Sequence, residues 1–278
     1  MASSMQIILV DFWLKGITCV RSRLIVLFLG LLFIPTFAKS NNSLAVILDN
    51  GMNVVAKDTL ETGQLIVITT EGWSSTQGKV WCFEKIDQEW VLISKGSVVV
   101  GLKGMGMGIG IRAFETAGVP QKKEGDLKAP AGIFRLGPAF GYAPAEEARW
   151  LKISYVQCDR NLLCIDDGLS SKYNKLVDAS KNKPDWTSRE EMRRKDDLYR
   201  WGLFVEHNAD DPKQGKGSCI FLHIWKNSTS GTAGCSAMPE EYLLKILKWI
   251  DSKKRPLLIQ FPLAEYNRLS KVMDLPEL

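Results

Sequence analysis

The chain has 278 residues, of which 45% are hydrophobic and 24% are charged, with a formal net charge of +5. This composition is ordinary for a globular protein, and it excludes a disordered chain and a membrane protein with many spans. The positive excess is small and forms no basic stripe, so nucleic acid is not an expected partner.

The first 38 residues have the pattern of a secretory signal peptide. Arg21 and Arg23 precede an apolar run over residues 24–34, and Thr36-Phe37-Ala38 offers a small-residue cleavage site. The run is short for a membrane-spanning helix, although an uncleaved anchor stays open. We therefore expect a periplasmic protein that meets the membrane only through this segment. Its removal lowers the formal charge from +5 to +3, because residues 1–38 hold three basic residues and one acidic residue.

Residues 39–78 are expected to form an N-terminal arm and the first strands. β-Branched and alternating segments predict strands at 44–48, 64–70, 79–84 and 90–100. Glycine is then dense over 101–110. No apolar helix follows that run, so we reject a nucleotide-binding loop and expect no nucleotide partner.

The rest of the chain continues in the same manner, mostly as strands. Strands are predicted at 133–136, 150–154, 162–165, 202–206, 218–223 and 257–261. A capping box formed by Ser188 and Glu191 predicts a helix as far as Tyr199, and a second helix follows Pro239. Residues 263–278 are expected to be a tail with one helical turn. This order predicts a mainly β fold (β-rich α+β) with two or three peripheral helices rather than a doubly wound sheet.

The most informative feature is Cys235, which lies twelve residues after His223, one of only two histidines. A thiol is a strong nucleophile only as the thiolate, and an imidazole is the side chain suited to take its proton near neutral pH. We expect Cys235 to lie at or just before the N-terminus of the second helix, where the helix dipole would lower its pKa. Glycines at 231 and 234 would let backbone N–H groups face a developing oxyanion. The alternative is a structural cysteine, since a lone Cys is often a small buried hydrophobe.

Export places the remaining cysteines in an oxidising compartment. Five cysteines lie outside the predicted signal peptide, so at least one thiol stays free unless chains pair. Cys235 is the candidate for that free thiol. We expect Cys164 to pair with Cys219, with Cys158–Cys164 as the alternative pairing.

Three blocks of sequence together resemble the L,D-transpeptidase catalytic domain, the YkuD-like (ErfK/YbiS-type) family of bacterial cell-wall enzymes. The first is Gly217 to Met238, with the cysteine and histidine just described. The second is Lys122-Lys123-Glu124-Gly125-Asp126 with Pro130-Ala131-Gly132, followed by Phe140-Gly141-Tyr142. The third runs from Cys164 to Asn174 and is similar to a subgroup with Gly-Cys-Ser/Thr-Ala at the nucleophile. The likeness departs from the usual family motif because Thr232-Ala233 replaces Ser-His before Gly-Cys.

The resemblance implies an L,D-transpeptidase-like β-sandwich over residues 79–262, followed by the tail 263–278. It implies that Cys235, His223 and Gly234 are catalytic, and that the substrate is a peptidoglycan stem peptide, joined or exchanged through a Cys thioester. Binding roles would fall on a wider set of residues: His207, Lys122, Glu124, Asp126, Tyr142, Thr232 and Ser236.

Two other functions stay open at this point. Water in place of an amine acceptor would make the enzyme an L,D-carboxypeptidase or amidase, and a structural Cys235 would leave a non-catalytic wall-binding domain. A cysteine nucleophile needs no metal, and the two histidines with scattered acids form no ligand cluster. We therefore expect neither a metal nor another cofactor.

Overall fold

The computed structural model describes residues 44–48, 52–56, 60–114 and 118–278. These residues belong to one compact unit, Asn42–Leu278. The predicted signal peptide, residues 1–38, lies outside the described residues. Within the described part of the chain, no helix is long and apolar enough to cross a membrane.

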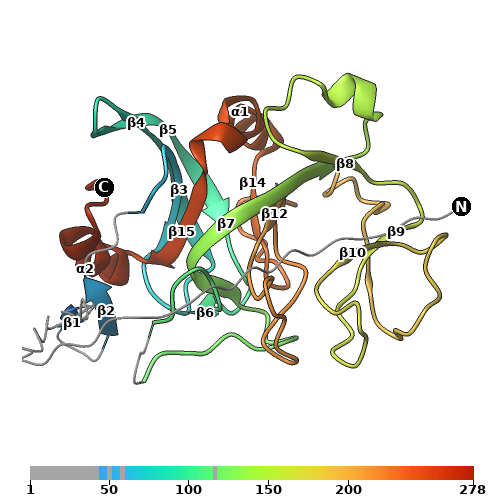
Figure 1. Ribbon diagram of the computed structural model, residues 1–278, viewed down its shortest axis with the longest axis horizontal. Helices are drawn as coiled ribbons and strands as arrows, with labels where there is room; N and C mark the ends of the chain where they lie inside the picture. Colours follow the sequence, from blue (N-terminus) through green and yellow to red (C-terminus); the bar gives the residue numbers. More distant parts are fainter. Residues whose placement is uncertain (1–43, 49–51, 57–59, 115–117) are drawn as a thin grey trace, which may run out of the picture. The chain divides into compact units, whose positions relative to one another are not determined.

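Eight strands form a sheet that closes on itself (Figure 1). Their order is β12-β13-β14-β5-β4-β3-β15-β7, and β7 pairs again with β12 to complete the circuit. The mainly β fold with few helices is thus confirmed. The strands are β3 (Gln64–Thr70), β4 (Gln77–Ile86), β5 (Glu89–Val99), β7 (Ala129–Gly141), β12 (Trp201–Val205), β13 (Phe221–Ile224), β14 (Ser236–Met238) and β15 (Leu257–Pro262).

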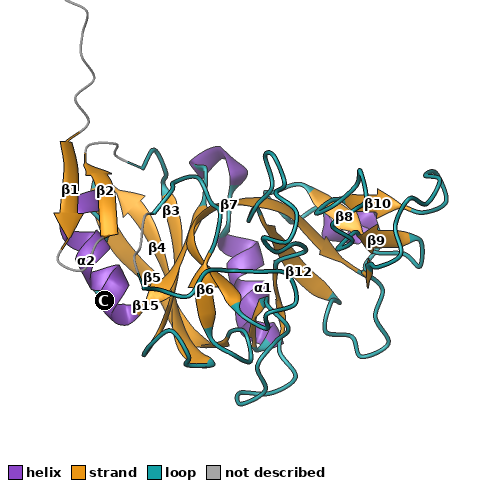
Figure 2. Ribbon diagram, turned by 90° about the horizontal axis from the view of Figure 1, so that it is seen from below, coloured by secondary structure: helices purple, strands orange, loops and turns teal. Residues whose placement is uncertain are grey.

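Shorter strands extend or accompany this closed sheet. β6 (Met105–Met107) and β8 (Tyr155–Gln157) each pair with β7 in parallel, and β1 (Leu44–Leu48) pairs with β2 (Met52–Ala56). A separate small sheet has the order β10-β9-β11, and Figure 2 shows β9 and β10 at the end of the unit opposite α2. Its strands are β10 (Leu176–Asp178), β9 (Leu162–Cys164) and β11 (Glu190–Glu191).

The closed sheet has a hydrophobic core because its strands are rich in β-branched residues and are covered on both faces. All seven residues of β3 are buried, and β3 pairs with β4 on one side and β15 on the other. Both α-helices add apolar residues to the same core: Tyr242 and Leu243 from α1 (Glu240–Trp249), and Tyr266 and Leu269 from α2 (Leu263–Met273). Burial of such side chains contributes about 1.5–3 kcal/mol each relative to exposure.

The helix predicted after Pro239 is confirmed as α1. Pro239 is its N-cap, and Glu240 and Glu241 supply negative charge to the first turn, where the helix dipole favours it. Tyr242 fixes this helix on the sheet, because its hydroxyl lies 3.1 Å from Oγ of Ser94.

Three local predictions were wrong. Residues 188–199 form no helix, because Glu190 and Glu191 pair with β9 and the chain then turns. Residues 150–154 form no strand; the chain turns there, and the strand is β8, which begins at Tyr155. The tail holds eleven helical residues in α2 rather than one turn, because its apolar face packs into the core.

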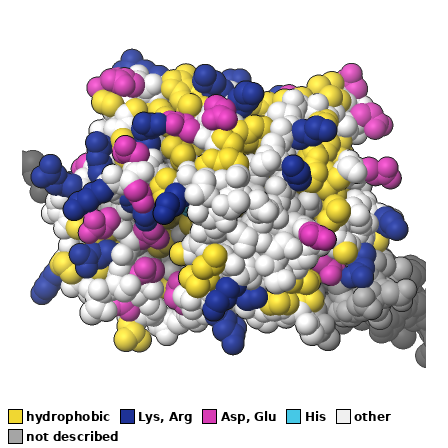
Figure 3. All heavy atoms as spheres, turned by 180° about the vertical axis from the view of Figure 1, so that it is seen from behind, with side chains coloured by type: hydrophobic (Ala, Val, Ile, Leu, Met, Phe, Trp, Pro, Cys, Tyr) yellow, Lys and Arg dark blue, Asp and Glu magenta, His cyan; other side chains and the backbone are white. Residues whose placement is uncertain are grey.

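Charged residues of both signs mix on the surface. Figure 3 shows Lys and Arg side chains interspersed with Asp and Glu on the face that it views. Such a mixed surface creates no strong single-sign field on that face.

Candidate functional site

The nucleophile candidate directly precedes one strand, and the base candidate lies on the neighbouring strand. β13 and β14 run parallel, with Leu222 opposite Ser236 and His223 opposite Ala237. Cys235 is in the bend immediately before β14, and it lines the same cavity as Ala237 and His223. The parallel pairing therefore brings two residues twelve positions apart to one cavity.

The thiol of Cys235 is buried, with 6% of the residue exposed. Its Sγ accepts the N–H of Phe221 at 3.3 Å and donates to the carbonyl oxygen of Cys219 at 3.6 Å. The strand β14 and Pro239 separate Cys235 from the start of α1. Cys235 is therefore not at a helix N-terminus, and that prediction was wrong.

The expected lowering of the thiol pKa is also not found. Burial, and to a smaller extent the negative charge of Glu190, raise the pKa of Cys235 to about 12. The hydrogen bond from Phe221, the charge of Lys122 and the nearby hydroxyl of Tyr199 act in the opposite direction but are smaller. At neutral pH the group in the resting protein is the thiol, so its proton must leave as attack occurs.

His223 is buried as well, and its ring is fixed by the backbone. Nδ1 lies 2.8 Å from the carbonyl oxygen of Ile224, which can only accept, so Nδ1 carries the proton. Nε2 is then left with the lone pair that a base requires. Burial lowers the pKa of His223 to about 4, so the ring is neutral near pH 7.

Cys235 and His223 line one cavity of about 520 Å³. Between these two described residues the structure contains no direct hydrogen bond. Tyr199 lies beside both instead: its ring centroid is 5.1 Å from that of His223, and it packs in the same buried cluster as Cys235.

Lys122 is buried in the wall of this cavity. Its Nζ donates to Asp126 Oδ1 and to the carbonyl oxygen of Lys123, each at 2.6 Å. A Cβ placed on Gly234 would lie 3.8 Å from that Nζ, so the ammonium is next to the turn before Cys235. An ammonium has three donors, which leaves one for a group in the cavity.

Three further predicted residues, Glu124, Thr232 and Gly234, line the cavity. Glu124 accepts the hydroxyls of Tyr173 at 2.5 Å and Ser218 at 2.7 Å. Thr232 Oγ1 donates to the carbonyl oxygen of Cys235 at 2.6 Å and accepts the N–H of Gly234 at 3.1 Å. The N–H of Gly234 is therefore engaged here, and its oxyanion role, which requires release from Thr232, stays a prediction.

His207 does not line the cavity and is completely buried. Its Nδ1 accepts the N–H of Ile109 at 3.2 Å, and Nε2 donates to the carbonyl oxygen of Lys216 at 3.0 Å. With both nitrogens occupied by backbone, His207 ties three segments together, and it makes no contact that would orient His223 or hold a substrate in this cavity.

The other three predicted binding residues support the walls instead of lining them. Asp126 holds Lys122 as described above. Tyr142 accepts the N–H of Arg194 at 2.9 Å and donates to its carbonyl oxygen at 3.2 Å. Ser236 is buried and donates to Oε1 of Gln260 at 2.6 Å.

Sequence reasoning missed one wall of the cavity. Tyr199, Glu190, Arg194, Asp166 and Asp196 all line it. Arg194 and Asp196 belong to the segment for which the sequence predicts a helix. The pairing of β11 with β9 that brings this segment inward has no local signal in the sequence.

The predicted Cys164–Cys219 disulfide is present, with the two Cα atoms 5.9 Å apart. It joins β9 to the segment just before β13. Cys82, Cys158 and Cys235 carry free thiols. Among the described residues there is no group of three or more His, Cys, Asp or Glu side chains that could hold a metal ion.

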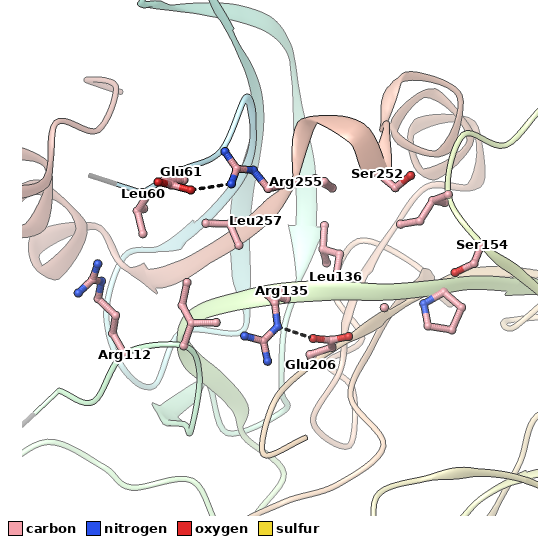
Figure 4. Close-up of a pocket in the computed structure, with 15 residues that line it drawn as sticks. Leu60, Glu61, Arg112, Arg135, Leu136, Ser154, Glu206, Ser252, Arg255 and Leu257 are labelled. Atoms are coloured by element: carbon pink, nitrogen blue, oxygen red, sulfur yellow. Dashed lines mark hydrogen bonds and ion pairs between the residues drawn. The ribbon is translucent and has the colours of Figure 1, made fainter. Parts of the chain in front are cut away.

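A second, larger cavity of about 820 Å³ has different chemistry (Figure 4). Arg135 pairs with Glu206 at 2.8 Å and Arg255 with Glu61 at 2.6 Å across an apolar floor that includes Leu257. Neither a thiol nor an imidazole lines this cavity, whereas the smaller cavity is lined by both.

Comparison with known proteins gives weak likenesses only. No protein-family profile matches the chain, and no curated protein matches it. Among solved structures, it is similar to the helical cell shape determining protein Pgp2 of Campylobacter jejuni, in a mutant form, with a TM-score of 0.36 and 16% identity. It is also similar to Bd1075 of Bdellovibrio bacteriovorus, with a TM-score of 0.35 and 12% identity. The matches cover 74% and 76% of this chain but 49% and 54% of the two structures, so the chain spans about half of their length.

Proposed function

We propose that this chain is an exported cysteine acyltransferase, an L,D-transpeptidase that acts on peptidoglycan stem peptides. The observation that carries the chemistry is that Cys235, just before β14, and His223, on the neighbouring β13, line one cavity. The choice of substrate rests on the sequence motifs around Lys122, Cys164 and Cys235.

In the proposed reaction, His223 Nε2 takes the thiol proton as sulfur attacks an amide carbonyl beside a D-centre. The C–N bond breaks, the amine leaves with the proton returned by His223, and a thioester remains on Cys235. An acceptor amine then attacks the thioester and regenerates the thiol.

The two perturbed pKa values favour a concerted proton transfer. A thiol with a pKa of about 12 and an imidazole with a pKa of about 4 do not form a standing thiolate–imidazolium pair at neutral pH. The proton therefore moves only when a substrate is in place, and an empty site stays protected from oxidation.

The test is product analysis with a disaccharide tetrapeptide, with and without an amine acceptor. Cross-linked or amine-exchanged products from the wild type, absent in Cys235→Ala, are expected. If tripeptide is the sole product even at high acceptor concentration, the reaction is hydrolysis. If neither protein forms any product, catalysis on this substrate is refuted. Cys158→Ala is the matched control, because that free thiol is buried away from the cavity.

A further inference from the structure

Tyr199 occupies a central place in the cavity that the proposed reaction does not use. It is 3% exposed, and its ring lies 5.1 Å from His223 and 5.5 Å from Phe221, measured between centroids. Phe221 is the residue whose backbone N–H contacts the sulfur of Cys235. The phenol therefore packs against β13, the strand that carries the base His223 and whose backbone contacts the nucleophile.

The hydroxyl of Tyr199 has one proton and, in the resting protein, one direct partner. It donates to Glu190 Oε1 at 2.7 Å, and its side chain packs in the same buried cluster and lines the same cavity as Cys235. A phenol donates a single hydrogen bond at a time, so donation to the carboxylate and donation to the sulfur are alternatives.

Glu190 is held at this place by the small sheet and by one cation. It pairs with Cys164 in β9, and Nη1 of Arg194 lies 3.3 Å from its Oε1. The guanidinium of Arg194 also lies 5.0 Å from the ring of Tyr199. The other charged side chains that line the cavity are Lys122, Glu124, Asp166, Asp196 and Lys226.

We propose that Tyr199 is a catalytic residue that donates a hydrogen bond to the Cys235 thiolate, and that Glu190 is a positioning residue that holds this hydroxyl while the sulfur is protonated. The assignment deepens the proposed acyl transfer and rests on it for its role in turnover.

The step conserves atoms and charge. The S–H bond breaks, the proton passes to His223 Nε2, and sulfur becomes negative. The Tyr199 O–H stays intact and turns from Glu190 to the sulfur, while Glu190 keeps Arg194 as its partner. A hydrogen bond to a buried anion is worth more than one to a neutral acceptor, so the sulfur competes with the Glu190 carboxylate for the hydroxyl only once its charge develops.

Two substitutions are expected to act in opposite directions. Tyr199→Phe keeps the ring contacts but removes the donor, so the thiolate becomes harder to form. Glu190→Gln removes a negative charge and leaves only a neutral amide oxygen as the competing acceptor, so the thiolate becomes easier to form. A merely structural role for both residues would not give opposite signs.

The experiment measures alkylation of Cys235 by iodoacetamide between pH 6 and 10, with the labelled peptide quantified by mass spectrometry. At pH 7 we expect a rate about tenfold lower for Tyr199→Phe, from the loss of a charge-assisted hydrogen bond, and a severalfold higher rate for Glu190→Gln. Tyr155→Phe is the matched control: it also loses a partly buried hydroxyl, one that donates to the carbonyl oxygen of Ala143 away from the cavity. Thermal unfolding of each variant checks that it is folded.

Unchanged alkylation of Tyr199→Phe, or a change of the same sign in both variants, overturns the proposal. Alkylation needs a thiolate but no acyl chemistry, so this result is independent of the proposed function. If the alkylation rates follow the expected pattern but the wild type forms no acyl-enzyme, the proposed transferase activity is overturned. The role of Tyr199 as a hydrogen-bond donor to the thiolate then stands. A folded wild type whose Cys235 resists alkylation at every pH overturns both.

Discussion

The two histidines of this chain have the same pKa of about 4 but different surroundings. His223 has one backbone partner and lines the cavity, whereas both ring nitrogens of His207 are taken by backbone groups. His223 is therefore the candidate base of the proposed reaction, whereas His207 holds backbone segments together.

We expect His223→Ala to lower the rate of Cys235 acylation at least about a hundredfold, because general-base catalysis contributes about 10²–10⁴. His207→Ala is expected to leave acylation within a few-fold but to destabilise the fold by roughly 1–3 kcal/mol for each backbone group left unpaired. Acylation rates and urea unfolding of both variants check this. A folded His207→Ala protein without acylation would reverse the assignment.

At the scale of elements, one disulfide ties the small sheet to the closed sheet. Cys164 in β9 and Cys219 before β13 are 55 residues apart in sequence. Closing a loop of that length removes entropy from the unfolded chain worth roughly 4 kcal/mol.

We expect reductant to lower the wild-type melting temperature and to loosen β11, which carries Glu190. The Cys164→Ala/Cys219→Ala variant is the control, and its melting temperature should be the same with and without reductant. Equal melting temperatures of the oxidised and reduced wild type would contradict a stabilising role of the disulfide.

The pairing of β12 with β7 also depends on one glycine. A Cβ on Gly202 would lie 2.1 Å from the ring of Phe140, which packs against Tyr199 and Phe221 beside the site. Gly202→Ala is therefore expected to cost at least about 1–3 kcal/mol of unfolding free energy and to slow alkylation of Cys235. Gly72→Ala, where the nearest atom is 3.9 Å away, is the control. Equal stabilities of the two variants in denaturant would refute the close contact.

At the scale of the whole molecule, the buried neutral histidines make stability depend on pH. Burial lowers the pKa of His207 and His223 from 6.5 to about 4. The unfolded chain then binds these protons more readily, so their contribution is complete above pH 6.5 and is lost as the pH falls towards 4. Each histidine accounts for up to roughly 3 kcal/mol. Urea unfolding at pH 7 and pH 5 should show the loss, with a smaller drop in His207→Gln; stability that rises on acidification would contradict it.

The sequence predicts those parts of the fold and of the site whose pattern lies in neighbouring residues. Strands such as β3 and the helix after Pro239 follow from their own residues, and the twelve-residue spacing of His223 and Cys235 suffices because β13 and β14 are neighbours. The Cys164–Cys219 pair was likewise expected from strand-like segments near the site.

The missed wall of the site comes from long-range pairing. Glu190 and Tyr199 lie in a segment whose local pattern favours a helix, yet pairing with β9 overrides that propensity. The raised pKa of Cys235 could not be predicted for a similar reason, because it depends on burial and on the distant Glu190. Tertiary contacts, not local patterns, set the chemistry around the thiol.

The proposed function requires Cys235 to be an acylable nucleophile. The direct test is the intact mass of the wild type, Cys235→Ala and Cys158→Ala after incubation with a carbapenem β-lactam. We expect one adduct on the wild type and on Cys158→Ala and none on Cys235→Ala. An unmodified wild type, or an adduct that persists in Cys235→Ala, would contradict the account.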